Sequence, residues 1–175
     1  MSKNTPEFSR VLDVKAVGNA VKENNLLAKP DERKSLEKRL GVLKINLFQI
    51  LYTVEQIPNK SFKISAKIKA ELNQECVVTS KPVKEKINEK IQIVLRPKNP
   101  GIKPENDVDL STVSTQIEEE MEIPSNGKID MGEVFTQYFA LALNPYPRSK
   151  SAEFSQKESD HSPKSNPFDV LKDLK

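Results

Sequence analysis

The sequence contains few of the residues on which catalytic and metal sites depend. Its 175 residues include one cysteine, one histidine, no tryptophan and five glycines. A single cysteine, Cys76, cannot form an internal disulfide, and with His161 alone it cannot complete a structural zinc site of the common types. Thiol proteases and zinc enzymes are therefore poor matches, and we expect a protein with no metal, no cofactor and no enzymatic activity.

Phosphate-binding loops and membrane spans are also missing from the sequence. The five glycines are too scattered for either common nucleotide-binding fingerprint. No segment approaches the roughly 18 uncharged apolar residues that span a bilayer, and residues 1–7 have no apolar signal core behind them. We therefore expect a cytoplasmic protein that has no membrane partner and does not hydrolyse nucleotides.

Charge is unevenly distributed, although the net charge is only +3. Residues 104–127 contain seven acidic residues and no lysine or arginine, whereas the rest of the chain holds all 28 basic residues and 18 acidic ones. An acidic loop beside a surface that attracts phosphate would produce this pattern. The plainer explanation is a solvated loop that stays disordered because it has too little apolar surface to bury.

Alternating residues give the clearest prediction of structure. Over residues 61–72 every second residue is apolar, and residues 83–96 repeat this pattern with lysines between the apolar positions. A period of two indicates strands with one dry face and one wet face, which is typical of an antiparallel sheet. A third strand over residues 42–54 completes a meander, and its change of phase predicts a β-bulge. Weaker alternation over residues 8–14 and 20–27 predicts two short strands.

Two helices are predicted beside this sheet. Pro30 suits the first position of a short helix that Gly41 ends. A broadly apolar helix over residues 131–143 follows Asp130, which is expected to form a capping box with Glu133. We therefore predict an α+β fold in which an antiparallel sheet, open or closed into a barrel, is packed by the two helices.

The chain divides into one domain and a tail. Residues 1–147 are predicted to form a single α+β domain, in which the acidic segment 104–127 is partly flexible. Residues 148–165 are serine-rich and without periodicity, so they are interpreted as a disordered linker that could not position His161 for catalysis. In residues 166–175, Phe168, Leu171 and Leu174 have the spacing of one helix face. This segment is expected to be either a short helix, which binds a partner or folds back onto the domain, or a frayed tail.

Basic residues lie on the wet side of both long alternating strands. Paired antiparallel strands would join them into one cationic surface that follows a polyanion backbone, with affinity arising from counterion release. An ordinary solvated sheet face is the alternative, because the aromatic residues on which single-stranded RNA platforms stack bases are missing from this face. The candidate RNA-binding residues are Lys63, Lys67, Lys69, Lys84, Lys86, Lys90 and Arg96.

Short motifs follow one another along most of the chain. They comprise residues 30–41, the strand that runs into 70–79, residues 81–83, the acidic segment, residues 129–134 and residues 141–148. Together these motifs resemble the YceD-like family of large ribosomal RNA subunit accumulation proteins, and residues 166–175 resemble one bacterial branch of it. The resemblance implies a bacterial or plastid-type protein that supports synthesis, processing or stability of 23S rRNA without an established catalytic activity.

The sequence departs from the family pattern at two positions. Many members have a second cysteine soon after the first, whereas Val78, Thr79 and Ser80 follow Cys76 here. Gln137 also occupies a helix position that is commonly acidic in the family. Because the further cysteines are missing, no metal site is carried over from the family, and because of Gln137 no function is assigned to that helix face.

These observations lead to one functional hypothesis and one alternative. We expect a ribosome-biogenesis factor that binds 23S rRNA precursor or an early large-subunit assembly intermediate through the basic sheet face. The alternative is a protein–protein adaptor without direct RNA contact. In that case the acidic segment and the C-terminal Phe168, Leu171 and Leu174 would recruit a ribosomal protein or an RNA-processing enzyme.

Overall fold

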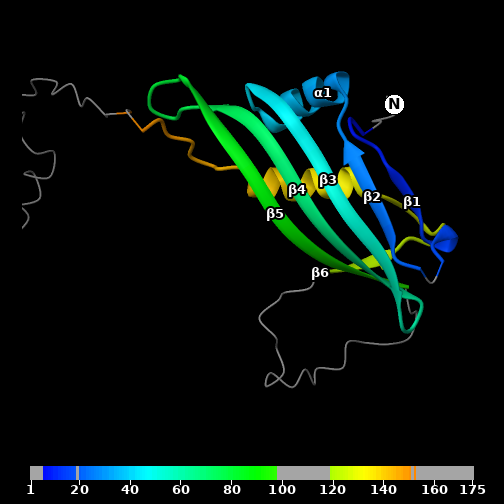
Figure 1. Cartoon of the computed structure of the whole chain (residues 1–175). Helices are drawn as coiled ribbons and strands as arrows, with labels where there is room; N and C mark the ends of the chain where they lie inside the picture. Colours follow the sequence, from blue (N-terminus) through cyan, green and yellow to red (C-terminus); the bar gives the residue numbers. More distant parts are fainter. Residues whose placement is uncertain (1–5, 19, 98–118, 151, 153–175) are drawn as a thin grey trace, which may run out of the picture.

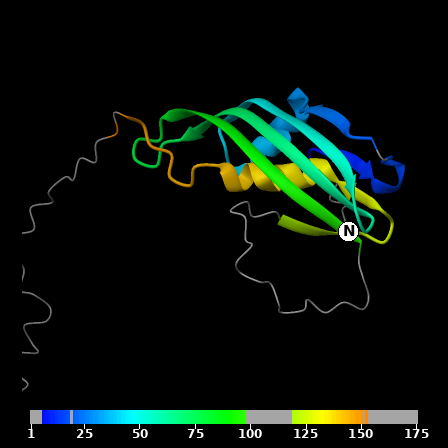
Figure 2. The same cartoon turned by 60° about the horizontal axis from the view of Figure 1, so that its bottom comes forward.

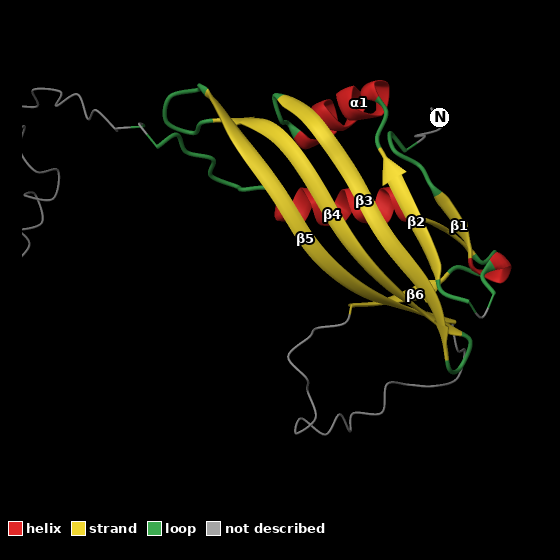
Figure 3. Ribbon diagram, viewed as in Figure 1, coloured by secondary structure: helices red, strands yellow, loops and turns green. Residues whose placement is uncertain are grey.

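The computed structural model describes residues 6–18, 20–97, 119–150 and 152. In chain order its elements are β1 (Val11–Asp13), the 3-10 turn η1 (Val14–Ala16), β2 (Lys22–Leu27), α1 (Pro30–Leu40), β3 (Lys44–Ile57), β4 (Ser61–Glu75), β5 (Pro82–Pro97), β6 (Glu119–Ile123), β7 (Lys128–Asp130) and α2 (Met131–Ala142). Figures 1 and 3 show a large sheet lying in front of both helices. This arrangement confirms the predicted α+β class.

The large sheet has the strand order β2-β3-β4-β5-β6, and β1 pairs with β7 in a separate two-stranded sheet. The predicted meander is confirmed, because β3, β4 and β5 pair antiparallel along most of their length. β6 runs parallel to β5 and pairs only with the last residues of β5, 93–97. No described strand joins β6 to β2, so the sheet is open and the barrel alternative is wrong.

The predicted β-bulge occurs near the start of β3. The pairing of β3 with β4 shifts register between Ile45 and Leu47. One extra residue at this point allows Ile45 and Phe48 to face the same side of the sheet, where both are buried. The change of phase in the sequence therefore reflects a real bend of the strand.

The hydrophobic core lies between the sheet and the helices, on what we call the inner face of the sheet. All the apolar alternating residues of β4 between positions 62 and 72 are buried there. Phe48 of β3 stacks on Phe139 of α2 with ring centroids 4.6 Å apart. Leu36 of α1 is fully buried in the same core. Figure 2 shows the long strands arching over α2, which leaves the opposite, outer face of the sheet without a covering helix.

The helix ends follow the predicted signals with one difference. Gly41 ends α1 in a left-handed conformation with φ of 66°. Oδ1 of Asp130 accepts hydrogen bonds from the backbone N–H groups of Gly132 at 3.0 Å and Glu133 at 3.4 Å. The Glu133 carboxylate does not form the predicted capping-box contact to the Asp130 backbone N–H; it binds the guanidinium of Arg39 at 2.5 Å and so connects α2 to α1.

Several predicted features lie outside the described residues. They are residues 104–118 of the acidic segment, residues 151 and 153–165 of the predicted linker, which include His161, and the C-terminal motif 166–175. The acidic residues that the structure does describe include those of β6. Among the described helices, none is long and apolar enough to cross a lipid bilayer.

Candidate nucleic-acid interface

The pairing of β4 with β5 places the candidate basic residues on one surface. Lys67 lies directly opposite Lys90, Lys69 opposite Asn88, and Glu71 opposite Lys86. Side chains alternate between the two faces of a strand, so lysines between buried β4 residues must point away from the core. All seven candidates therefore lie on the outer face, opposite the helices in Figures 1 and 2.

The charge of the outer face differs between the two ends of the strands. At the end where β6 pairs, Arg96 binds Glu120 at 2.7 Å and lies beside Glu122 in the parallel register. Lys63 lies opposite Glu55 of β3 at the same end. These acidic residues offset the charge of Arg96 and Lys63, so the two contribute little to an anion-binding surface.

The other five candidates form what we call the lysine patch: Lys67, Lys69, Lys84, Lys86 and Lys90. Lys86 binds the Glu71 carboxylate at 2.8 Å, an exposed contact that raises the pKa of the Lys86 amine through hydrogen bonding. Such an exposed pair is weak and is screened by salt. Within residues 6–18, 20–97, 119–150 and 152, the remaining four lysines have no ion pair. The patch therefore retains a net positive charge.

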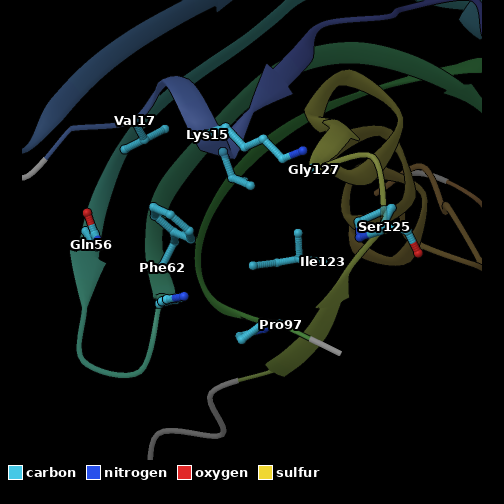
Figure 4. A pocket seen from close by; sticks show the side chains of 11 residues that line it. Lys15, Val17, Gln56, Phe62, Pro97, Ile123, Ser125 and Gly127 are labelled. Atoms are coloured by element: carbon cyan, nitrogen blue, oxygen red, sulfur yellow. The ribbon is translucent and has the colours of Figure 1, made fainter. Parts of the chain in front are cut away.

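A separate cavity lies at the end of the sheet where β3 turns into β4. It measures about 710 Å³, and its walls include Val14 of η1, Val17 just after η1, Phe62 of β4 and Ile123 of β6. Figure 4 shows Lys15 at its rim, with Phe62 and Ile123 facing one another across it. Its walls are mostly apolar, and it lies away from the lysine patch.

Cys76 is buried in the turn between β4 and β5. Hydrogen bonds from the Thr79 side chain and from the Ser149 backbone N–H lower the pKa of the thiol to about 6. The backbone N–H of Val77 donates to the Pro147 carbonyl at 3.0 Å. The turn and the segment after α2, both singled out in the sequence, are thus joined in the structure. Cys76 is 1% exposed.

The cysteine turn is held by a second contact to the same segment. Nε2 of Gln74 donates to the carbonyl of Asn144 at 3.1 Å. Among the described residues, no group of three or more His, Cys, Asp or Glu side chains is arranged to hold a metal ion. The contacts of Cys76 fit a structural role for the turn.

Comparison with known families identifies the chain. The family model described as large ribosomal RNA subunit accumulation protein YceD matches residues 64–175, which is more than half of the chain. The chain belongs to the YceD family. Membership gives the protein a role in the accumulation of large-subunit ribosomal RNA and hence in ribosome biogenesis. Searches of curated proteins and of solved structures gave no match.

The YceD match covers the parts of the structure that carry the candidate interface. It begins within β4 and includes the whole lysine patch, the cysteine turn and α2. β2, α1 and β3 lie before the matched residues. The resemblance recognised from short motifs is therefore confirmed at the level of the family.

Sequence reasoning did not single out the uncharged residues beside the lysine patch. Leu51 of β3 lies directly opposite Lys67, and Gln92 of β5 lies opposite Ser65. The alternation assigns each of them to the wet face, but only the pairing register brings them together.

Proposed function

We propose that this YceD-family protein is a non-enzymatic ribosome-biogenesis factor that binds 23S rRNA precursor, or an early large-subunit assembly intermediate, through the lysine patch. The observation that carries the proposal is the register of β4 and β5, which gathers five lysines on one uncovered sheet face. Four of them have no acidic partner in the described part of the chain. A ribosomal RNA backbone supplies the phosphates that such a surface attracts.

The energetics of this contact follow from counterion release. Each lysine that neutralises a phosphate displaces condensed counterions, so affinity decreases as salt concentration rises. About five phosphate contacts on a single strand predict a log–log salt slope near −3.5. A contact of this kind positions the protein on RNA without specifying sequence.

The experiment measures binding of the purified protein to a 23S rRNA fragment across a salt series. Reversing two charges of the patch, in Lys67→Glu with Lys90→Glu, should weaken binding at least about tenfold and flatten the slope. The matched control is Lys34→Glu with Lys38→Glu, which changes the net charge equally on exposed positions of α1. Equal loss in both variants, or no loss in either, would reject the lysine patch as the contact.

The adaptor alternative is tested by deleting the C-terminal residues that would bind the partner. Its partner-binding residues, Phe168, Leu171 and Leu174, lie outside the described residues. Deleting residues 166–175 should leave RNA affinity intact if the patch is the contact. If instead the deletion abolishes the effect on 23S rRNA in cells while the patch variant retains it, the adaptor mechanism replaces ours.

A further inference from the structure

A groove crosses the outer face at right angles to the strands. It has a volume of about 700 Å³ and is lined by three consecutive residues from each of β2, β3, β4 and β5. Its floor follows one register row, in which Tyr52 lies opposite Asn24 and Ala66, and Ala66 lies opposite Ile91. These four strands span three interstrand spacings, or about 14 Å. We call this feature the transverse groove.

Two rows of outward side chains form the walls of the transverse groove. One row carries Lys67 and Lys90 next to Leu51 and Asn25. The opposite row consists of Glu23, Thr53, Ser65 and Gln92. One wall therefore carries two ammonium groups, a leucine and an amide, and the other carries a carboxylate at its β2 end, two hydroxyl groups and an amide.

The lysine pair in the first wall is unfavourable unless an anion lies between its members. Lys67 and Lys90 are directly opposite across two antiparallel strands, where Cβ atoms are about 5 Å apart. Like charges at this separation repel and destabilise the pairing. Within the described residues, neither lysine has an ion pair. One phosphate group between the two ammonium groups would remove the repulsion.

The rest of the groove offers groups that a simple anion would not use. Leu51 is 40% exposed although it lies between polar neighbours. The Gln92 side chain makes no hydrogen bond in the described part of the chain, and its Oε1 is buried without a partner. An apolar surface and an unused amide beside a phosphate site suit a nucleobase, which has an apolar face and a hydrogen-bonding edge.

We propose that the transverse groove binds a short single-stranded segment of RNA, with one phosphate between Lys67 and Lys90, a base packed on Leu51 and its edge hydrogen-bonded to Gln92. This inference rests on the proposed function and refines it. A duplex keeps its base faces stacked and its Watson–Crick edges paired, so it can offer the groove only phosphates. The lysine patch thus attracts RNA in general, and the groove selects unpaired nucleotides.

The test compares three polyanions at one salt concentration: a single-stranded RNA oligonucleotide, the duplex of the same sequence, and inorganic polyphosphate. Leu51→Ala and Gln92→Ala should each weaken binding of the single strand about threefold or more, while binding of duplex and polyphosphate stays unchanged. The controls are Leu27→Ala and Asn88→Ala, which remove an exposed leucine and an exposed amide from the same face outside the groove. Neither control should change binding.

The outcomes separate this inference from the proposed function. If Lys67→Glu with Lys90→Glu weakens binding of all three polyanions but Leu51→Ala and Gln92→Ala weaken none, the patch stands and the groove inference is overturned. Equal affinity of wild-type protein for single strand and duplex overturns it as well. If no RNA binds at all, both the proposed function and the groove inference fail. All four single substitutions change side chains on the outer face, and thermal unfolding checks that the fold is retained.

Discussion

At Gly132 the backbone of α2 closely approaches the backbone of another segment. It is the second residue of α2 and lies against the chain that precedes β1. A Cβ atom at this position would lie 2.1 Å from the Phe8 carbonyl oxygen and 2.9 Å from the Arg10 backbone nitrogen. Neither backbone atom can move away as a flexible side chain could, so the close approach requires glycine.

Gly132→Ala should therefore destabilise the fold, although alanine is the better helix former. Overpacking against backbone predicts a loss of about 2 kcal/mol or more in the free energy of unfolding, measured by denaturant titration. Gly18→Ala is the control, because a Cβ there would meet nothing within 4 Å. Equal stability of the Gly132 variant and wild type would show that the N-terminal segment packs differently.

Cys76 is expected to make the free energy of unfolding depend on pH. Its folded-state pKa of about 6 lies below the ordinary thiol value, chiefly because the Thr79 side chain and the Ser149 backbone donate hydrogen bonds to sulfur. A group with a lowered folded-state pKa stabilises the fold most above its unfolded pKa, and that contribution is lost as pH falls toward the folded-state value. The relevant window therefore runs from about pH 8.5 down to pH 6.

Cys76→Ala should remove this pH dependence. Relative to the variant, the wild-type protein in reducing buffer should gain unfolding free energy as pH rises through that window, and thiolate absorbance should show titration near pH 6. A constant difference between the two proteins across the window would show that the thiol stays protonated.

At the scale of elements, Asp130 joins three parts of the fold. Its Oδ1 caps α2 and also accepts the Arg10 backbone N–H at 2.7 Å, next to the start of β1. Asp130 itself is the last residue of β7. One carboxylate therefore fixes the corner where the small sheet meets the helix.

Asp130→Ala should cost about 0.5–2 kcal/mol of unfolding free energy, the usual range for removing a helix cap. Asp31→Ala is the matched control in the first turn of α1, where the carboxylate makes no hydrogen bond in the described structure. Its loss should stay within a few tenths of a kcal/mol. Similar losses in both variants would mean that helix-dipole interaction, rather than the shared cap, accounts for the effect of Asp130.

Elements with local signals could be predicted from sequence, including the short strands β1 and β2, whereas the pairing of β6 and β7 could not. Alternation over β4 and cap residues around α1 are local signals, so both elements were found close to their true bounds. β6 and β7 have five and three residues, and their pairing partners are distant in sequence. The parallel pairing of β6 with β5 depends on tertiary contacts that no local pattern encodes.

The candidate interface was predictable only in part for the same reason. Alternation alone assigned the basic residues to the wet face of each strand. Which of them lie together depends on register: it pairs Lys67 with Lys90 but brings Arg96 beside β6 and its glutamates. The contribution of Leu51 likewise depends on pairing between β3 and β4.

At the scale of the whole molecule, the two faces of the sheet differ in composition and in what covers them. The inner face holds the core against α1 and α2, and the outer face carries the lysine patch without a covering helix. Charge reversals within the lysine patch should therefore alter RNA binding with little effect on stability. This separation is the basis of our account of a YceD-family protein in large-subunit RNA accumulation.

Lysine footprinting tests that account most directly. The purified protein is acetylated with and without a 23S rRNA fragment, and the modified lysines are identified by mass spectrometry. We predict that RNA protects Lys67, Lys69, Lys84, Lys86 and Lys90, while Lys34 and Lys38 of α1 react equally in both samples. Protection confined to α1, or equal reactivity of the lysine patch with and without bound RNA, would contradict the account.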